Sequence, residues 1–425
     1  MSGRPAAKAA LLPPPIPDWP IVAFHGENSW PEPDVSAARA QIIAEDLWRP
    51  APRTGADEAG GQWDDDGALS TSRWIDPWRG HELSILDGVS ALSFLHHAAR
   101  RNRGEHKLIG MSPWKRRCVA PFLTGPDGPP GDGGRPVVWG GDVEAQGALR
   151  VEDGFLRSVG LGLRHTPPAS LTFDETAPYF DATKRNGFEE TVSAATFDVA
   201  LTERARALRN RVLSLRLTKY NLVSEAALPD AGEREAVLVP GQVETDASIR
   251  LGGAEVRTNA ALMEAARELH PDAFIIYKPH PDVLTGMREG DVPGAHKIAD
   301  HVEADASAPD CLDWADRVVT ITSLMGFEAL MRGKAVTTLG RPFYSGWGLT
   351  DDRSPPKRDR TLTLDELVAA ALILYPRYVD PVTRLPAPVE VVVEALAEEI
   401  AAAGTLSSRA KRVWRGAASW VLNRI

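Results

Sequence analysis

The chain has 425 residues, of which 43% are hydrophobic and 25% charged, a composition typical of a folded protein with two or three domains. Its 48 basic and 58 acidic residues give a net charge of −10, which argues against a chain-wide nucleic-acid-binding surface. Two cysteines, Cys118 and Cys311, exclude a disulfide framework and a cysteine-based zinc site, and favour a cytoplasmic location.

The first part of the chain is rich in Pro, Gly, Ala and Asp, and residues 54–70 have the composition of a linker. We expect no signal peptide, because prolines break the N-terminus, and no membrane span, because no apolar run approaches 18 residues. A globular region is predicted from Trp74, with a helix over 84–102, a loop over 125–135 and a short buried strand over 137–141.

The second half alternates strands and helices more regularly. Strands are predicted at 236–241, 273–281, 316–323 and 335–340, and helices at 257–270, 326–333 and 364–375. This alternation indicates a doubly wound parallel sheet, in which ligands bind beyond the carboxyl ends of the strands. The turns KPHPD and TSLMGFE both follow such ends.

Two segments of the chain resemble each other weakly. Residues 74–92 and 378–396 both start with an aromatic and an aliphatic residue near an Asp-Pro pair, and a helical pattern follows in each. The similarity either reflects a unit that occurs in tandem elsewhere or arises by chance.

The turn at 278–283, KPHPDV, is the first candidate for a ligand site. Two prolines fix the backbone on either side of His280, and Lys278 adds a cation two residues earlier. A His and a Lys at a strand's end would suit a phosphate group. The alternative is a rigid turn that carries a surface histidine.

The segment TSLMGFEALMRGK at 322–334 is a second candidate. Thr322 or Ser323 is expected to cap a helix whose free N–H groups attract an anion, and Glu328, about one turn later, suits two ribose hydroxyls. The alternative is an ordinary helix cap with a favourably placed acid.

Two further loops follow predicted strands. In RPFYSGWG, Tyr344 and Trp347 either form a wall of a sugar or base pocket or belong to the core. In VPGQVETDASI, Gln242, Glu244 and Asp246 either meet a ligand or lie in a solvated loop.

The stretch VEDGFLRSVGLG at 151–162 places an acidic pair at a glycine-rich turn. Arg157 lies four residues after Asp153 and would hold that carboxylate ionised and oriented, as a nucleophile or general base in glycosyl transfer requires. Read alone, the pair fits a turn and cap better than a catalytic role. Glu152 and Asp153 are neighbours on an extended segment, so their side chains are expected on opposite sides.

The C-terminal residues 409–425 have apolar residues at helical spacing and a polar face with five basic residues and no acid. Such a helix, with two tryptophans, suggests the surface of an anionic membrane; a helix docked on the protein body is the alternative.

Together, these motifs resemble the capsular polysaccharide β-Kdo glycosyltransferases of the KpsC/LipB type. The resemblance rests on VEDGFLRSVGLG, LTKYN (217–221), LVPGQVETDASI, IIYKPHPDV and 323–352, with MSPWKRR (111–117) and LYPRYVDPVT (374–383), and covers about residues 74–397. It implies an α/β, GT-B-like fold with two Rossmann-like domains facing a cleft. The domains expected are an N-terminal extension (1–73), an acceptor-side domain (74–222), a donor-side domain (223–397) and a basic helix (398–425).

The resemblance further implies a retaining enzyme that transfers Kdo from CMP-Kdo to a glycolipid or Kdo-terminated acceptor at the inner face of the cytoplasmic membrane. The enzyme implied by the resemblance requires no metal or cofactor. Asp153 corresponds to the proposed nucleophile, with Glu152 and Arg157 in the same pocket. Donor binding falls to His280 at the phosphate and to the helix holding phosphate and ribose; with the candidates above, the expected donor residues are Lys278, His280, Ser323, Gly326, Glu328 and Gln242.

This chain departs from the family in two ways. Capsule-type members commonly carry two tandem transferase modules, and these 425 residues have room for one, so a partner transferase or other capsule proteins would supply the alternating linkage. VVWGGD at 137–142 lacks the basic residue expected after WG, which concerns acceptor contacts. Two other functions remain: a nucleotide-sugar enzyme of the same fold, such as a sialyltransferase-like enzyme or an epimerase, or a non-catalytic capsule assembly or export protein.

Overall fold

The computed structural model describes residues 22–23, 30–45, 69–70, 72–125, 127–141, 145–160, 166–221, 227–286 and 288–403. The chain forms two compact units: Met1–Pro136 with Tyr378–Val391, and Val137–Arg377 with Val392–Ile425. The boundary predicted between residues 222 and 223 falls outside the described residues, and the predicted domain limits stay predictions. The basic helix predicted at 409–425 also lies outside the described residues.

The smaller unit contains a three-stranded antiparallel sheet in the order β1-β2-β3 and the predicted helix over 84–102, observed as α3. The Ser84 side chain caps α3 by accepting a hydrogen bond from the Asp87 N–H at 3.1 Å. Gly88 lets α3 lie directly on the buried Trp74 ring. The elements are β1 (Val22–Ala23), α1 (Glu32–Ala44), β2 (Arg73–Ile75), β3 (Glu82–Leu83), α3 (Ile85–Arg101), β4 (His106–Ile109) and α4 (Pro113–Leu123).

The two similar segments meet within this smaller unit. Arg79 Nη1 lies 3.1 Å from Oδ1 of the fully buried Asp380, and Trp78 Nε1 donates to the Pro386 carbonyl at 3.0 Å. In each segment the aspartate accepts backbone N–H bonds from the turn after the Asp-Pro pair: Asp76 from Trp78, and Asp380 from Thr383. The sequence similarity therefore corresponds to a shared turn geometry.

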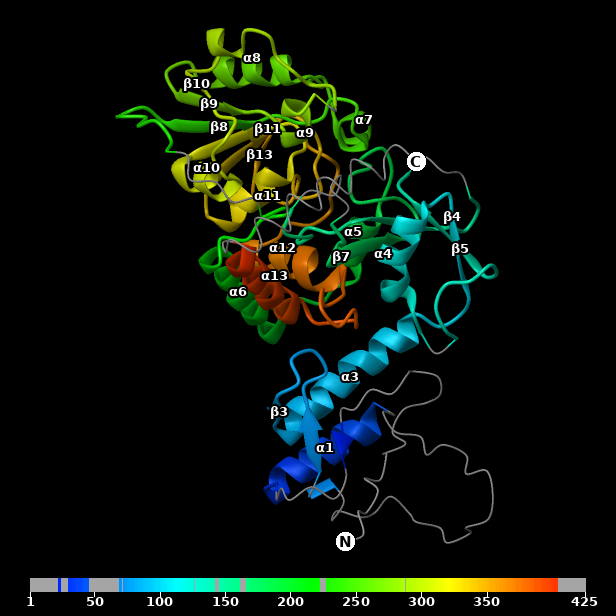
Figure 1. The fold of residues 1–425 in the computed structure, drawn as a ribbon. Helices are drawn as coiled ribbons and strands as arrows, with labels where there is room; N and C mark the ends of the chain where they lie inside the picture. The colour runs from blue at the N-terminus through cyan, green and yellow to red at the C-terminus, as the bar shows by residue number, and fades with distance from the viewer. Residues whose placement is uncertain are drawn as a thin grey trace, which may run out of the picture. The chain divides into compact units, whose positions relative to one another are not determined.

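The larger unit contains a six-stranded parallel sheet in the order β10-β9-β8-β11-β12-β13. All five residues of β8 are buried, as expected for a central strand covered on both faces. In Figure 1, α8 covers one face of this sheet, and α10 and α11 cover the other. The main elements are β8 (Ala236–Pro240), α8 (Asn259–Leu269), β9 (Phe274–Lys278), α10 (Ala308–Trp314), β11 (Arg317–Thr320), α11 (Leu324–Met331) and β12 (Ala335–Thr338).

This arrangement confirms the four strands and the helices predicted in the second half, and the doubly wound sheet. The predicted helix over 364–375 is α12 (Leu364–Val368), which continues into a π-helical stretch, η3 (Ala369–Leu374). Both pack against α6 (Val199–Ser214). The shorter elements are α7 (Ala247–Gly252), α9 (Pro281–Leu284), η2 (Ala295–Lys297), β10 (His301–Val302), β13 (Asp351–Asp352), β14 (Arg377–Tyr378) and α13 (Val389–Ala403).

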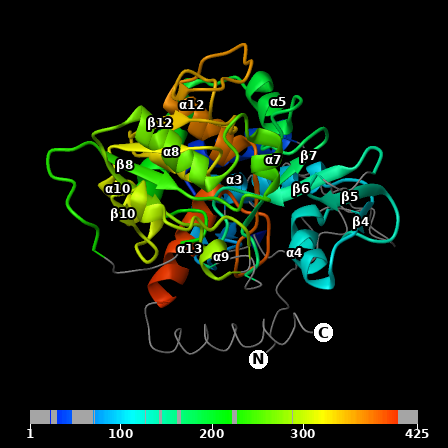
Figure 2. The same cartoon turned by 90° about the horizontal axis from the view of Figure 1, so that it is seen from above.

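The larger unit has a second sheet, in which β6 (Leu149–Asp153) lies between β5 (Arg135–Trp139) and β7 (Ser170–Asp174). The predicted strand over 137–141 is β5, which runs parallel to β6. β7 lies beside β6 (Figure 2) and runs antiparallel to it, with Asp153 opposite Leu171. Neither β6 nor β7 was predicted from the sequence. The helix α5 (Gly187–Ala194) comes after β7 in the chain.

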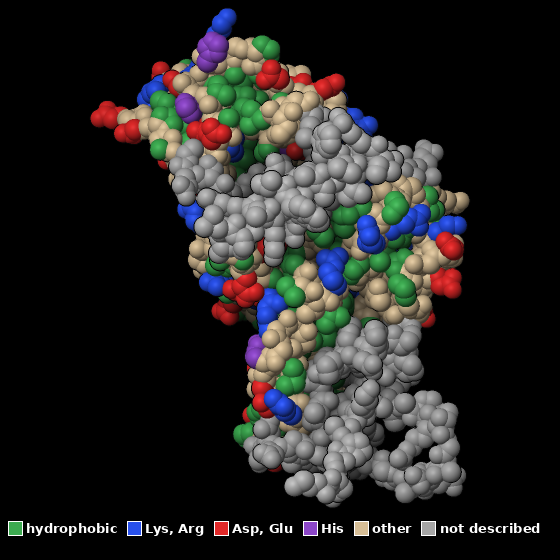
Figure 3. Space-filling model, viewed as in Figure 1, with side chains coloured by type: hydrophobic (Ala, Val, Ile, Leu, Met, Phe, Trp, Pro, Cys, Tyr) green, Lys and Arg blue, Asp and Glu red, His purple; other side chains and the backbone are tan. Residues whose placement is uncertain are grey.

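No helix within the described ranges is long and apolar enough to cross a membrane. On the one face drawn in Figure 3, basic side chains of the described residues are scattered among acidic and hydrophobic ones.

Candidate functional site

Asp153 is the last residue of β6, and its carboxylate faces a fixed guanidinium. Asp153 Oδ2 lies 2.8 Å from Arg157 Nε, and the two side chains are 22% and 3% exposed. Asp153 Oδ1 has no hydrogen-bond partner among the described residues. The next residue in the chain is Gly154, and a Cβ at this position would collide with the Ser170 side chain. The sequence prediction that Arg157 orients Asp153 is confirmed by this geometry.

Arg157 is itself held in place from two sides. Its Nη1 donates to Ser158 Oγ at 2.8 Å and to the Thr166 carbonyl at 3.2 Å, while its own carbonyl accepts from the Ala169 N–H at 2.7 Å. A guanidinium fixed in this way presents a constant charge to Asp153 without reorganising.

Glu152, the other member of the acidic pair, is half-buried. Removal from water, and then the neighbouring Asp153 carboxylate, raise the pKa of Glu152 to about 8. Lys219 and Asp246 also act on this pKa, so both charges lie close to Glu152. A carboxyl with this pKa can exchange a proton near neutral pH.

The segment LTKYN at 217–221 docks on the turn that follows Asp153. The Lys219 carbonyl accepts from the Arg157 and Ser158 N–H groups at 3.2 and 3.3 Å, and Asn221 Nδ2 donates to the Ser158 carbonyl at 3.1 Å. Asn221 has a positive φ of 48°, a conformation that Asn tolerates better than most residues. The segment is thereby fixed with Lys219 at the site.

Lys219 connects this turn to α11. Its backbone N–H donates to Oε1 of the buried Glu328 at 3.0 Å. Burial lowers the pKa of Lys219, but the neighbouring Tyr220, Tyr179 and Asp153 side chains more than offset this and raise it above its usual value. The Lys219 amine lies 5.4 Å from the centroid of the Tyr220 ring. LTKYN is one of the motifs that carry the family resemblance, but no role was predicted for Lys219 or Tyr179.

Glu328 lies in α11, as predicted, but its hydrogen bond with the Lys219 N–H was not predicted. Burial raises its pKa to about 7, against the opposing effect of Arg332 and of the Lys219 N–H. One of its oxygens is bound to the Lys219 N–H, so the proposed ribose contact would share this carboxyl with the LTKYN segment.

His280 caps the short helix α9. Its Nδ1 accepts a hydrogen bond from the Asp282 N–H at 3.1 Å, so the proton of the neutral ring lies on Nε2. Burial lowers the pKa of His280, while Asp282 and Asp246 raise it less. Lys219 also acts on this pKa, which places His280 near the same charges that surround Glu152.

Lys278, predicted to form a phosphate clamp with His280, has a hydrogen bond within the protein. Its Nζ donates to the Ala306 carbonyl at 2.6 Å, and the residue is 9% exposed. The ammonium lies near the buried Cys311, on whose pKa it acts. The Lys278 amine is thus bound within the protein, and its predicted contact with a donor phosphate beside His280 stays a prediction.

Gln242 and Ser323 organise the start of α11. The Gln242 amide donates to Thr322 Oγ1 and accepts from the Thr322 N–H, both at 2.9 Å. Ser323, rather than Thr322, caps the helix by accepting from the Met325 N–H at 3.3 Å. The contacts of Gln242 within the protein thus position the helix end at which phosphate binding was predicted.

Tyr344 is fully buried and cannot form a wall of an open sugar pocket. Its hydroxyl donates to the Ser323 carbonyl at 2.5 Å, and Gly326 leaves the space that the Tyr344 ring fills. The predicted pocket role of Tyr344 was therefore wrong. Gly326 serves this packing, and its predicted donor contact stays a prediction. Trp347 lines a pocket elsewhere in the unit.

An aromatic cluster lies behind Asp153. The Phe155 ring stacks on Phe343 at a centroid distance of 4.4 Å and an angle of 16°, and Tyr179 meets Phe155 edge-on at 4.9 Å. These rings join residues of the β6 turn to the loop after β12. This packing fixes the two halves of the larger unit around the charged groups.

The structure thus brings together residues that are far apart in the chain. The charges of Asp153, Lys219 and Asp246 act on the pKa of Glu152, those of Asp246 and Lys219 act on the pKa of His280, and Glu328 is hydrogen-bonded to the Lys219 backbone. Lys278 and Tyr344 lie apart from them. The catalytic and binding roles of the grouped residues stay predictions.

Comparison with known proteins identifies relatives of the chain. The family model described as "Capsule polysaccharide biosynthesis protein" matches residues 210–378. The chain is 39% identical over 341 residues to capsule polysaccharide modification protein LipA of Neisseria meningitidis serogroup A / serotype 4A, covering 74% of this chain and 48% of LipA. It is 48% identical over 236 residues to lipopolysaccharide-processing protein LpsZ of Rhizobium meliloti, covering 54% of each. The chain spans about half the length of these curated relatives.

Two solved structures are similar in both fold and sequence. The β-Kdo 2,7 transferase of Thermosulfurimonas dismutans KpsC has a TM-score of 0.58 and 34% identity, covering 69% of this chain and 99% of that chain. The β-Kdo 2,4 transferase of the same KpsC has a TM-score of 0.57 and 35% identity, covering 62% and 86%. The fold is accordingly α/β and GT-B-like, and the chain belongs to the KpsC-type family of capsule polysaccharide Kdo transferases.

Proposed function

We propose that this protein is a retaining β-Kdo transferase that moves Kdo from CMP-Kdo to a lipid-linked or Kdo-terminated acceptor. The observation that carries the proposal is the Asp153 carboxylate at the end of β6, paired with Arg157 at 2.8 Å and with its second oxygen unpaired among the described residues. The similar KpsC structures are β-Kdo transferases by name, which supports Kdo as the transferred sugar.

CMP-Kdo presents one phosphodiester, which the protonated Nε2 of His280 and the N–H groups at the start of α11 would bind. The hydrogen bond from Asp282 N–H to His280 Nδ1 supports this use of Nε2. Gln242 would act through Thr322, by holding that helix end in place. No metal is required in this proposal, because these donors and the nearby cations offset the single phosphate charge.

The first displacement uses Asp153. An Asp153 oxygen attacks C2 of Kdo, and the bond from C2 to the phosphate oxygen breaks, so CMP leaves with the electron pair. Kdo carries a carboxylate on C2, and the Lys219 ammonium, whose pKa is raised partly by Asp153, is the cation we assign to that carboxylate. CMP is already a stable anion, so its departure needs little protonation.

The second displacement restores Asp153. An acceptor hydroxyl oxygen attacks C2, the bond between C2 and Asp153 breaks, and the hydroxyl proton passes to the ionised form of Glu152. A pKa of about 8 makes Glu152 a base of suitable strength near neutral pH. Two inversions at C2 give net retention.

The test is transfer by wild type, Asp153→Asn and the control Asp230→Asn, which alters an exposed aspartate outside the site. We expect Asp153→Asn to lower kcat by at least about 10³-fold and the control to match wild type. The product's anomeric configuration, read by NMR, should be β, and mass spectrometry of quenched wild type should find Kdo on the peptide containing Asp153. An active Asp153→Asn variant, or an inverted product, would refute the proposal. Measuring transfer in the presence of EDTA tests whether the reaction proceeds without a metal.

We further propose that the protein acts at the inner face of the cytoplasmic membrane, held by residues 409–425, beside other capsule proteins. The support is the basic, tryptophan-containing helical pattern of that segment. Deleting 409–425 should weaken binding to vesicles containing phosphatidylglycerol but not change the weak binding to phosphatidylcholine vesicles. Equal binding of both forms to anionic vesicles would contradict it.

A further inference from the structure

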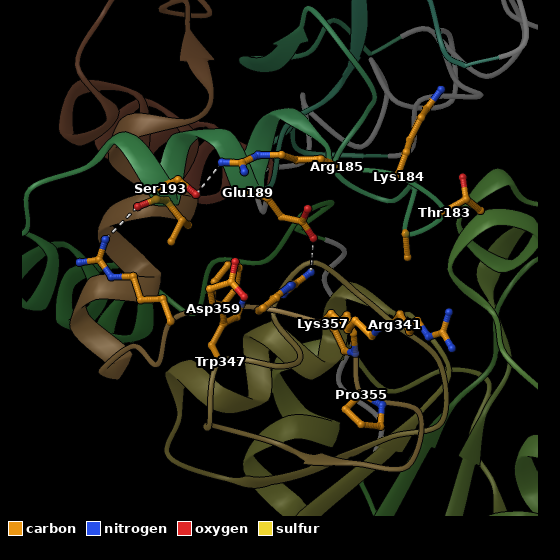
Figure 4. A pocket seen from close by; sticks show the side chains of 15 residues that line it. Thr183, Lys184, Arg185, Glu189, Ser193, Arg341, Trp347, Pro355, Lys357 and Asp359 are labelled. Carbon is orange, nitrogen blue, oxygen red and sulfur yellow. Dashed lines mark hydrogen bonds and ion pairs between the residues drawn. The ribbon is translucent and has the colours of Figure 1, made fainter.

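A basic pocket lies in the larger unit and shares no residue with the group around Asp153. Its volume is about 490 Å³, within the range of ligand pockets. Residues 182–185 and α5 form one side, and the loop residues from Arg341 to Arg360 form the other (Figure 4).

The lining of this pocket is strongly positive although the whole chain carries a charge of −10. Its only acids are Glu189 and Asp359, and Glu189 lies 3.4 Å from the guanidinium of Arg358. Against these stand six basic side chains: Lys184, Arg185, Arg341, Lys357, Arg358 and Arg360. The balance favours a ligand with several negative charges.

Two of the arginines are fixed by the fold. Arg358 lies over the Trp347 ring at 4.3 Å and donates to the carbonyls of Phe343, at 2.6 Å, and Ser345. Arg360 donates to the Val192 carbonyl at 3.0 Å and lies over an aromatic ring at 4.7 Å. Glu189 pairs with Arg358, whose side chain is 3% exposed, so Arg358 shapes the pocket wall. Arg360 is held by an uncharged carbonyl and a ring, so its charge remains available at a fixed position.

Three other cations are exposed at the pocket. Lys184 is 3.7 Å from Asp181, and Arg185 donates to the uncharged Ser193 hydroxyl at 2.8 Å. No ion pair or hydrogen bond joins the Lys357 amine to another side chain or carbonyl in the described part of the chain. Lys184 shares its charge with Asp181, while Arg185 and Lys357 can meet carboxylates or phosphates from solution.

Packed side chains connect the pocket to the turn that follows Asp153. Phe343, whose carbonyl binds Arg358, stacks its ring on Phe155, two residues after Asp153. Tyr179, on whose pKa Asp153 acts, lies only four residues before Thr183 of the pocket, at most about 14 Å of extended chain. The pocket is therefore connected to the turn after Asp153 through packed side chains.

We infer that this pocket binds the carboxylates of the acceptor's sugar chain, and this rests on the proposed function. A Kdo oligomer carries one carboxylate on each sugar, so several cations spaced along a pocket match it. The lining combines these cations with apolar side chains such as Trp347 and Pro355, which suits a sugar acid with a charged carboxylate and apolar ring faces. The single phosphate of the donor is assigned to His280 and α11, which are not part of this lining.

The test uses the full chain with Lys184→Glu and Lys357→Glu combined. The matched control is Lys297→Glu, an exposed lysine that does not line the pocket. Calorimetry measures binding of a lipid-free Kdo trisaccharide, of phosphatidylglycerol vesicles and of CMP, and initial rates give KM for acceptor and donor. We expect the double variant to weaken trisaccharide binding and raise acceptor KM by at least about tenfold, with donor KM within twofold and the control like wild type.

Three results would overturn the inference: unchanged trisaccharide affinity in the double variant, loss of vesicle binding without loss of trisaccharide binding, or competition of CMP for the trisaccharide. The pair Lys184→Gln and Lys357→Gln, with melting temperatures for all variants, shows that any loss arises from charge rather than unfolding. Trisaccharide binding is measured without turnover, so an inactive wild type would refute the proposed function while leaving this result readable.

Discussion

The backbone N–H of Lys219 donates a 3.0 Å hydrogen bond to Oε1 of Glu328. Lys219 belongs to the segment that holds the turn after Asp153, and Glu328 to the helix α11 beside β11 and β12. A single carboxyl thus connects the surroundings of Asp153, the proposed nucleophile, to the predicted donor side.

This hydrogen bond predicts different effects for two substitutions of Glu328. Glu328→Ala removes the acceptor and leaves the Lys219 N–H unpaired, so the free energy of unfolding should fall by about 1–3 kcal/mol. Glu328→Gln keeps an oxygen acceptor and should unfold within about 1 kcal/mol of wild type. Chemical denaturation measures both, and equal losses would show that the bond contributes little.

The raised pKa of Glu152 predicts the pH dependence of transfer. If the ionised form accepts the acceptor's proton, kcat should rise with pH, reach half its maximum near pH 8, where Glu152 is half ionised, and level off about one unit higher. Glu152→Gln should abolish this rise and lower kcat about 10²-fold or more. A pH–rate profile of both proteins checks this, and an unaltered profile in the variant would exclude Glu152 as the base.

The separate positions of Lys278 and His280 predict opposite phenotypes. His280→Ala should raise KM for CMP-Kdo about tenfold or more, since it removes a donor to the phosphate. Lys278→Met should leave that KM near the wild-type value but lower the unfolding free energy by about 1–3 kcal/mol, since the Ala306 carbonyl loses its partner. Donor kinetics and thermal unfolding of both variants distinguish them; a raised donor KM in Lys278→Met would instead support the predicted clamp.

Asp174 predicts a pH dependence of stability away from the site. Its carboxyl is 1% exposed, accepts from the Tyr375 hydroxyl at 2.7 Å, and has a pKa raised by burial to about 7. The folded protein therefore holds this proton more tightly than the unfolded chain, so the free energy of unfolding falls as pH rises from about 4 to 7. The loss for three units is on the order of 4 kcal/mol.

Asp174→Asn has no charge to develop, so its stability relative to wild type should improve as the pH rises from 5 to 8. Denaturation at these two pH values measures the change, with Asp230→Asn as the exposed control. A difference between variant and wild type that is the same at both pH values would contradict the pKa assignment.

The inner strands of the six-stranded sheet were predictable because each contains a short apolar run followed by a turn, whereas the two-residue edge strands β10 and β13 were not predicted. β8, β9, β11 and β12 were all recognised in this way. The strands β6 and β7 were not, because LRVED and SLTFD mix polar and apolar residues and the paired strand runs antiparallel.

The sequence by itself determined the parallel sheet, the caps and turns at its strand ends, and the pairing of Asp153 with Arg157, because these depend on residues close in the chain. Only the tertiary structure decided that Lys278 binds the Ala306 carbonyl, that Tyr344 is buried under Gly326, and that Lys219 joins Glu328. The direction of a side chain at a strand end, and its distance from a residue a hundred positions away, depend on how the elements pack. Local spacing does not contain that information.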